Sequence, residues 1–348
     1  MINAKNEINY NELVNPTFTT GQATLEMLAA SGNQDAITYK NLLAVTGATE
    51  KVGGDANSQN QFFTPEEGRA LMMGITLSVE ARYAAVTRLL KESGYKSMLD
   101  IASGYTPRAL MCQKNGIDYV GMDLPAVVDK MLPLSRKVLA TGSHPAYVTG
   151  DVTNATSLKQ AADLLQGELF ISCEGLLTYL NTSELEQAIH GIRQVLLAHG
   201  GAWYTSDMDV QYDHFSAVAI NNPDALQRFA AVMRNVRKES DVYFFPTTFK
   251  SLEEKISFFE ERGLYVELCP FYTDDTQLNI LYGFDSEGQA RMKHLMKSFH
   301  IWKMPASEEN NETITNALKA MQTAEHNRRK DAVKSALLAR LAEINENR

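Results

Sequence analysis

The stretch from Lys96 to Asp123 reads KSMLDIASGYTPRALMCQKNGIDYVGMD and alternates apolar runs with turn residues. It predicts a strand over 97–102, a turn over 103–107, a helix over 107–115 and a strand over 118–122. Gly104 in the turn lets a ligand approach the backbone. Asp123, which follows it at about the 20-residue spacing of such units, can accept hydrogen bonds from two ribose hydroxyls. The stretch therefore predicts a nucleoside-binding unit.

The composition is that of a large globular chain without a nucleic-acid surface. The 348 residues are 44% hydrophobic and carry a net charge of −9, whereas phosphate binding needs clustered Lys and Arg. No stretch approaches the roughly 18 apolar residues of a membrane span, and the polar N-terminus predicts no signal peptide. Three widely spaced cysteines, Cys112, Cys173 and Cys269, indicate a reducing compartment and no metal or disulfide site. We expect a cytosolic protein that binds neither membrane nor nucleic acid.

A long helix is predicted before the first strand. Thr64 is its cap, Pro65 fits its first turn, Glu67 completes a capping box and Gly94 ends it. Arg82 falls on the apolar stripe of this helix and needs an anion, because an unpaired buried charge is very costly. That anion could be a ligand carboxylate or the partner in a structural salt bridge, and the side chain could also snorkel to solvent.

The remaining chain predicts a doubly wound α/β fold. Further strands are expected over 146–149, 168–173 and 202–207. Since helices separate them, the first five strands form a parallel sheet with right-handed crossovers. Strands over 265–269 and 278–282 form an antiparallel hairpin, because their connection is too short for a crossover helix. We therefore expect a seven-stranded, mostly parallel sheet with an antiparallel last strand.

Helical segments flank this sheet. Residues 1–94 are expected to form a helical N-terminal cover, and residues 95–285 the core. The core contains a helical insertion over 208–262 that could cover a substrate. Residues 286–348 are expected to form a helical C-terminal extension, whose last helix could dock on the body or on a second subunit as a homodimer.

Three acidic residues end successive parallel strands: Asp123, Asp151 and Glu174. The carboxyl ends of such a sheet bind ligands, although an acid there often only caps the next helix. The turn at Gly104 lacks G-x-G-x-x-G and so offers no full cradle for a pyrophosphate. S-adenosylmethionine has no phosphates. The three acids could serve its ribose, adenine edge and ammonium, with Arg82 on its carboxylate, which suits a methyltransferase better than a dehydrogenase.

The chain resembles the leucine carboxyl methyltransferases and the tetracenomycin-type polyketide O-methyltransferases, which are class I, Rossmann-like enzymes. The matching segments, between about residues 75 and 205, are Ala81–Tyr83, Ile101–Arg108, Val120–Pro125, Gly150–Val152 and Glu174–Leu180. The family's turn usually reads Gly-x-Gly-x-Asp-Thr-Arg. Here Ala102 replaces the first glycine, and Thr106 and Pro107 replace the Asp-Thr pair, but Gly104 and Arg108 remain.

This resemblance implies a set of site residues. It implies that S-adenosylmethionine is bound by Arg82, Gly104, Asp123, Asp151 and Glu174, and by their motif neighbours Ser103, Leu124, Val152 and Gly175. It also places Tyr179 near the methyl group and the acceptor, as the candidate catalytic residue. Packing beside Leu176 and Leu180 is the alternative for this ring. No metal is expected.

The implied reaction is in-line methyl transfer to a small-molecule acceptor, a carboxylate or a polyketide-like hydroxyl. Alignment of the two reactants can supply about 7–11 kcal/mol of the barrier. A hydroxyl needs a general base, and neither His190 nor His199 is placed as one, which favours a carboxylate. Two alternatives stay open: a non-catalytic binding or assembly protein that keeps the fold, and a nicotinamide-dependent dehydrogenase, which the missing glycines disfavour.

Overall fold

The computed structural model describes residues 20–45, 64–207, 251–298 and 300–305, and the single positions 215, 218, 219, 221, 224, 228 and 249. Its sheet has seven strands in the order β3-β2-β1-β4-β5-β7-β6. They are β1 (Ser97–Ile101), β2 (Asp118–Asp123), β3 (Tyr147–Thr149), β4 (Leu169–Cys173), β5 (Gly201–Thr205), β6 (Glu267–Pro270) and β7 (His300–Pro305). The first five strands pair in parallel, which confirms the predicted mostly parallel α/β fold.

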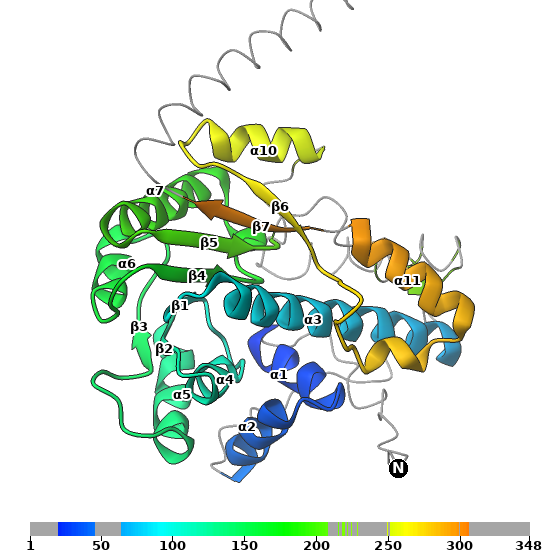
Figure 1. Cartoon of the computed structure of the whole chain (residues 1–348). Coiled ribbons are helices and arrows are strands. Elements are labelled where there is room, and N and C mark those ends of the chain that lie inside the picture. Colours follow the sequence, from blue (N-terminus) through cyan, green and yellow to red (C-terminus); the bar gives the residue numbers. More distant parts are fainter. Residues whose placement is uncertain are drawn as a thin grey trace, which may run out of the picture.

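Helices cover both faces of this sheet (Figure 1). They are α1 (Thr20–Ala30), α2 (Gln34–Val45), α3 (Pro65–Ser93), α4 (Arg108–Lys114), α5 (Pro125–Val138), α6 (Ala155–Ala162), α7 (Thr182–His199), α10 (Leu252–Glu260) and α11 (Ser286–Ser298). Alternate residues of one strand point to opposite faces. Met98 of β1 accordingly belongs to the hydrophobic cluster that includes residues of α1 to α5 and α11, whereas Leu99 belongs to the cluster that includes residues of α6, α7 and α10. Helices therefore cover both faces of the sheet, and the strand ends are the part of it that parallel α/β folds use to bind a ligand.

Helix α3 has the predicted boundaries. The Thr64 hydroxyl accepts from the Glu67 N–H at 3.2 Å, and Glu67 Oε2 accepts from the Thr64 N–H at 3.0 Å. Gly94 ends the helix in the left-handed conformation, with φ 76°. The capping box and the terminal glycine thus fix a 29-residue helix, which begins on the side of α11 and ends beside the sheet just before β1 (Figure 1).

The strand predicted over 278–282 is wrong, because Ile280–Gly283 forms a short 3-10 helix, η3. Glu80 of α3 accepts from the backbone N–H groups of Asn279 and Ile280 at 2.7 and 3.0 Å. These two donors are therefore occupied by α3. The antiparallel strand is β7, which pairs with both β5 and β6 and lies in the segment expected to be helical.

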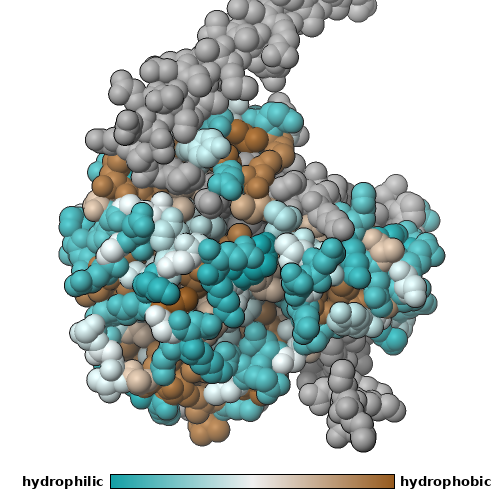
Figure 2. All heavy atoms as spheres, in the orientation of Figure 1, coloured by the Kyte–Doolittle hydropathy of each residue, from teal (hydrophilic) through white to brown (hydrophobic). Residues whose placement is uncertain are grey.

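Most of the insertion predicted over 208–262 lies outside the described residues, as does the part of the predicted C-terminal extension after residue 305. Helix α10 lies within that predicted helical insertion. In the view of Figure 2, hydrophilic residues cover most of the described surface, and apolar residues gather beside α10 and along the lower edge. In the described part of the chain, no helix has the length and apolar character needed to cross a membrane.

Candidate functional site

The turn after β1 and the end of β2 meet at one carboxylate. Strands β1 and β2 are parallel neighbours, with Ile101 opposite Met122, so the chain leaves both at the same edge of the sheet. The backbone N–H of Gly104 donates to Asp123 Oδ2 at 2.7 Å, and that of Leu124 donates to Oδ1 at 2.7 Å. The predicted juxtaposition of Gly104 and Asp123 is therefore present. Leu124 itself is 57% exposed beside it.

Asp123 keeps capacity to bind a ligand. Its carboxyl is half-buried, and this burial raises its pKa, while the two backbone N–H groups act in the opposite direction. Each carboxylate oxygen has two lone pairs, and each oxygen accepts one hydrogen bond from a backbone N–H group here. One lone pair on each oxygen is left, so the carboxylate can also accept from two hydroxyl groups, such as the two of a ribose.

Ala102 is held in a left-handed conformation. Its φ is 52°, in the region that favours glycine, and Gly104 two residues later has φ 56°. A Cβ in this region costs roughly 1–2 kcal/mol. The turn therefore keeps the backbone geometry of a two-glycine turn although its first position is an alanine.

Glu174, at the end of β4, is held by two arginines. Its Oε2 accepts from Arg108 Nη2, and its Oε1 lies 3.6 Å from Arg82 Nε. The three side chains are between 1% and 11% exposed. Burial raises the pKa of Glu174, and the charges of Arg108 and Arg82 oppose this rise. The salt-bridge alternative for Arg82 is thus present in the structure, and its partner is another predicted site residue.

The same network contains Asp100, which the sequence analysis did not use. Asp100 lies inside β1 and accepts from the Tyr119 hydroxyl at 3.0 Å and from the Ser172 hydroxyl. Arg108 Nε lies 3.7 Å from Asp100 Oδ2, and the guanidinium lies 4.6 Å from the centre of the Tyr83 ring. An acid within an otherwise apolar strand is the sequence signal that could have found it.

Arg108 is the charge that holds this network together. It is 1% exposed. Burial by itself would lower its pKa, but Glu174 and Asp100 outweigh that effect and raise it. Two cations and two anions are thus buried together, which is tolerated only when each is paired.

Several polar atoms of this region make no hydrogen bond within the described residues. They are Glu174 Oε1, Arg108 Nη1, Ser103 Oγ and the Tyr83 hydroxyl. Buried polar groups are normally satisfied, so such a group of exceptions calls for an explanation. A polar ligand or ordered water at the strand ends would supply the missing partners.

Asp151 follows β3 and forms a local turn. Its Oδ1 accepts from the Thr153 N–H at 2.9 Å and from the Thr153 hydroxyl at 2.8 Å, while Asn154 is the cap of α6. The carboxylate is exposed, and Val152 beside it is buried. The turn beginning at Asp151 is tied to the site, because the Gly150 N–H donates to the backbone oxygen of Asp123 at 2.9 Å.

The loop after β4 carries Gly175 and Tyr179. Gly175 has φ 74°, and a Cβ at this position would lie 4.0 Å from Arg82 Nη2. Tyr179 is partly buried in the short helix η2 (Leu177–Tyr179), and its N–H donates to the Leu176 oxygen at 2.9 Å. The loop thus lies against the Arg82–Glu174 pair, and Tyr179 is on the same short segment.

Helix α1 lies on the glycine turn. A Cβ at Gly21 would meet the Tyr105 ring at 3.0 Å and the Gly104 Cα at 3.7 Å. Helix α2 is joined to α4 by an ion pair between Asp35 and Lys114. The described part of the N-terminal segment therefore contacts the turn that the sequence assigns to the cofactor.

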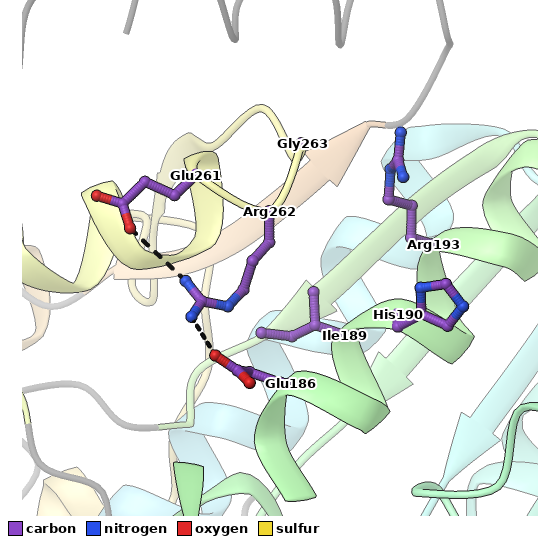
Figure 3. A pocket seen from close by; sticks show the side chains of 7 residues that line it. All are labelled: Glu186, Ile189, His190, Arg193, Glu261, Arg262 and Gly263. Carbon is purple, nitrogen blue, oxygen red and sulfur yellow. Dashed lines mark hydrogen bonds and ion pairs between the residues drawn. The ribbon is translucent and has the colours of Figure 1, made fainter. Parts of the chain in front are cut away.

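A separate cavity of about 620 Å³ lies between α7 and the end of α10 (Figure 3). It is lined by Glu186, Ile189, His190, Arg193, Glu261, Arg262 and Gly263. Arg262 pairs there with Glu186 and stacks on the Phe258 ring at 3.5 Å. None of the predicted site residues lines this cavity, which lies on the face of the sheet that α6, α7 and α10 cover.

No family model matches this chain, and neither does any curated protein sequence. Among solved structures, the chain is similar to magnesium protoporphyrin IX methyltransferase from Synechocystis PCC 6803 with bound S-adenosylhomocysteine, at 11% identity and a TM-score of 0.40, over 73% of this chain and 100% of that one. It is similar to a DUF574 family protein from Streptomyces avermitilis at 16% identity and a TM-score of 0.41, over 77% and 94%. An O-methyltransferase family protein from Burkholderia thailandensis is 11% identical with a TM-score of 0.38, over 81% and 72%. All three likenesses are weak.

Proposed function

We propose that this protein is an S-adenosylmethionine-dependent O-methyltransferase that acts on a small-molecule acceptor. The observation that carries the proposal is the bond from the Gly104 N–H to Asp123, which puts an open turn and a carboxylate together at adjacent strand ends. That pair fits a nucleoside ribose. The absence of a glycine-rich phosphate cradle in the turn from Ala102 to Pro107 favours a nucleoside without phosphates.

The polar groups near β4 fit the methionine end of this cofactor. Glu174 Oε1 has no hydrogen-bond donor within the described residues and suits an ammonium group. Arg82 already faces Glu174, but a guanidinium has five N–H donors, so this ion pair is compatible with a second carboxylate. When bound, S-adenosylmethionine supplies an electrophilic methyl group. The chain's own residues would bind and orient it, with Tyr179 next to the acceptor.

The acceptor class is inferred from the two histidines of α7. His199 lies 3.4 Å from Asp163, and His190 lines the cavity between α7 and α10, so neither is placed as a general base at the strand ends near Asp123. An acceptor that is already anionic needs no proton removed. We therefore place a carboxylate first and a polyketide-like hydroxyl second, in line with the resemblance to the leucine carboxyl and tetracenomycin-type enzymes.

A methyl-transfer assay tests this proposal. The full chain is incubated with methyl-labelled S-adenosylmethionine and a panel of small carboxylic acids and phenols. We expect label to move to one class, and to carboxylic acids before phenols. Binding of the cofactor without transfer to any acceptor would favour the non-catalytic alternative. We further propose that the protein is cytosolic and forms a homodimer, and that it divides into a helical cover, a core and a helical extension.

A further inference from the structure

Asp207, just after β5, binds the loop that follows β4. It is 2% exposed. Its Oδ1 accepts from the Gly175 N–H at 2.6 Å, and its Oδ2 accepts from the N–H groups of Leu176 and Leu177 at 2.7 and 2.9 Å. One buried carboxylate thus receives three consecutive backbone donors.

Consecutive backbone N–H groups that point to one spot form a concavity for an anion. Here the anion is part of the chain. The loop it holds begins at Glu174 and continues through Gly175, with φ 74°, to Tyr179. Without Asp207, these three backbone donors would need other partners, and the loop would lose the contacts that fix its path past Arg82.

Lys255 of α10 binds the backbone of Asp207. This lysine is fully buried, and its Nζ donates to the backbone oxygen of Asp207 at 2.5 Å. The Asp207 N–H in turn donates to the Thr205 hydroxyl at 3.1 Å. Hydrogen bonds therefore hold Asp207 at its backbone as well as at its carboxylate.

We propose that Asp207 is a positioning residue, which holds Glu174 and Tyr179 in place for the methyl donor and the acceptor. This inference rests on the proposed function, since only then do these two side chains have a ligand to face. Nothing in the contacts of Asp207 requires it to touch the ligand itself.

The test compares Asp207→Ala with Glu80→Ala. Glu80 is a matched control, because it too is a buried carboxylate that accepts from consecutive backbone N–H groups, those of Asn279 and Ile280 in η3. Both variants lose buried bonds and should lose stability. Hydrogen exchange of the full chain should show faster exchange at residues 175–177 in Asp207→Ala only, and at 279–280 in Glu80→Ala only.

Affinity for S-adenosylhomocysteine separates positioning from stability. We expect Asp207→Ala to bind it about tenfold or more weakly, because the loop carrying Glu174 is released, and Glu80→Ala to bind it normally. Asp207→Asn, which keeps one acceptor oxygen, should lie between wild type and Asp207→Ala in both readouts and serves if Asp207→Ala does not fold. Unchanged exchange at 175–177, or equal losses of affinity in Asp207→Ala and Glu80→Ala, would overturn the inference. If wild type itself binds no S-adenosylhomocysteine, the proposed function fails, and the exchange at 175–177 alone decides whether Asp207 holds the loop.

Discussion

The Gly104 N–H lies 2.7 Å from Asp123 Oδ2, although 19 residues separate the two in the chain. This bond joins the turn after β1 to the end of β2, so the shape of the turn and the position of the carboxylate are set together. A ligand that fits one must fit the other.

Removing the Asp123 carboxylate should weaken cofactor binding. Hydrogen bonds to a charged group are worth about 1.5–3 kcal/mol, so we expect Asp123→Ala to raise the dissociation constant for S-adenosylhomocysteine about tenfold or more. Asp118→Ala is the control, because Asp118 begins the same strand and pairs with His144 at 3.0 Å. Titration calorimetry measures both variants, and a loss that is equal in the two would contradict the role of Asp123.

Restoring glycine at position 102 should stabilise the protein. Ala102 has φ 52°, and removing its Cβ from this left-handed conformation should stabilise the folded state by roughly 1–2 kcal/mol. The greater freedom of glycine in the unfolded chain offsets part of this gain. We expect Ala102→Gly to raise the free energy of unfolding by about 0.5–1 kcal/mol. Ala188→Gly, inside α7, should instead lower it by about 1 kcal/mol. Urea unfolding measures both, and a less stable Ala102→Gly protein would contradict the strain at this turn.

Removing the Arg108 charge should destabilise the fold strongly. Arg108→Met leaves Glu174 without its Arg108 partner and removes the ion pair between Arg108 and Asp100, and breaking a buried pair in this way costs about 3–5 kcal/mol. Lys159→Met, which removes an exposed pair with Asp163, should change stability by less than about 1 kcal/mol. Comparable effects of the two substitutions in urea unfolding would show that the Arg108 network is not a paired, desolvated one.

The stability of the protein should fall as pH rises from mildly acidic to neutral. Burial raises the pKa of Glu80 from 4.5 to about 7, so the folded state holds a proton that the unfolded state has lost in this window. Burial also raises the pKa of Asp100, Asp123 and Glu174. Where the folded state binds more protons, the free energy of unfolding decreases with pH.

The substitution Glu80→Gln measures the contribution of Glu80 alone to this pH dependence. The amide does not titrate, so the variant should lose less stability than wild type between about pH 5 and about pH 7. Thermal unfolding at several pH values in one ionic strength gives the two slopes. Identical slopes would mean that Glu80 keeps an ordinary pKa in the folded protein.

The sequence was sufficient for the local features of this fold. The apolar runs predict β1 to β5, and the capping box at Thr64 with the glycine at Gly94 predicts α3 to the residue. It was misleading over 278–282, where an apolar run resembles a strand. The outcome there depends on Glu80, about 200 residues away in the chain, which takes the backbone donors of that run.

The sequence likewise predicts the local features of the candidate site but not its long-range pairs. Gly104 and Asp123 follow from the spacing within a single βαβ unit, and that spacing is local. The pairs of Glu174 with Arg108 and of Asp207 with Gly175 join residues 66 and 32 positions apart, and they depend on the order of the strands in the sheet. A charge pattern in the sequence identifies such residues as candidates but does not say which anion meets which cation.

The most direct test of the central claim is titration calorimetry of the full chain with S-adenosylhomocysteine and, in parallel, with NADH. The geometry at Gly104 and Asp123 predicts binding of S-adenosylhomocysteine, no binding of NADH, and a loss of about tenfold or more in Asp123→Ala. Binding of NADH alone, or no binding of either compound by wild type, would contradict the claim.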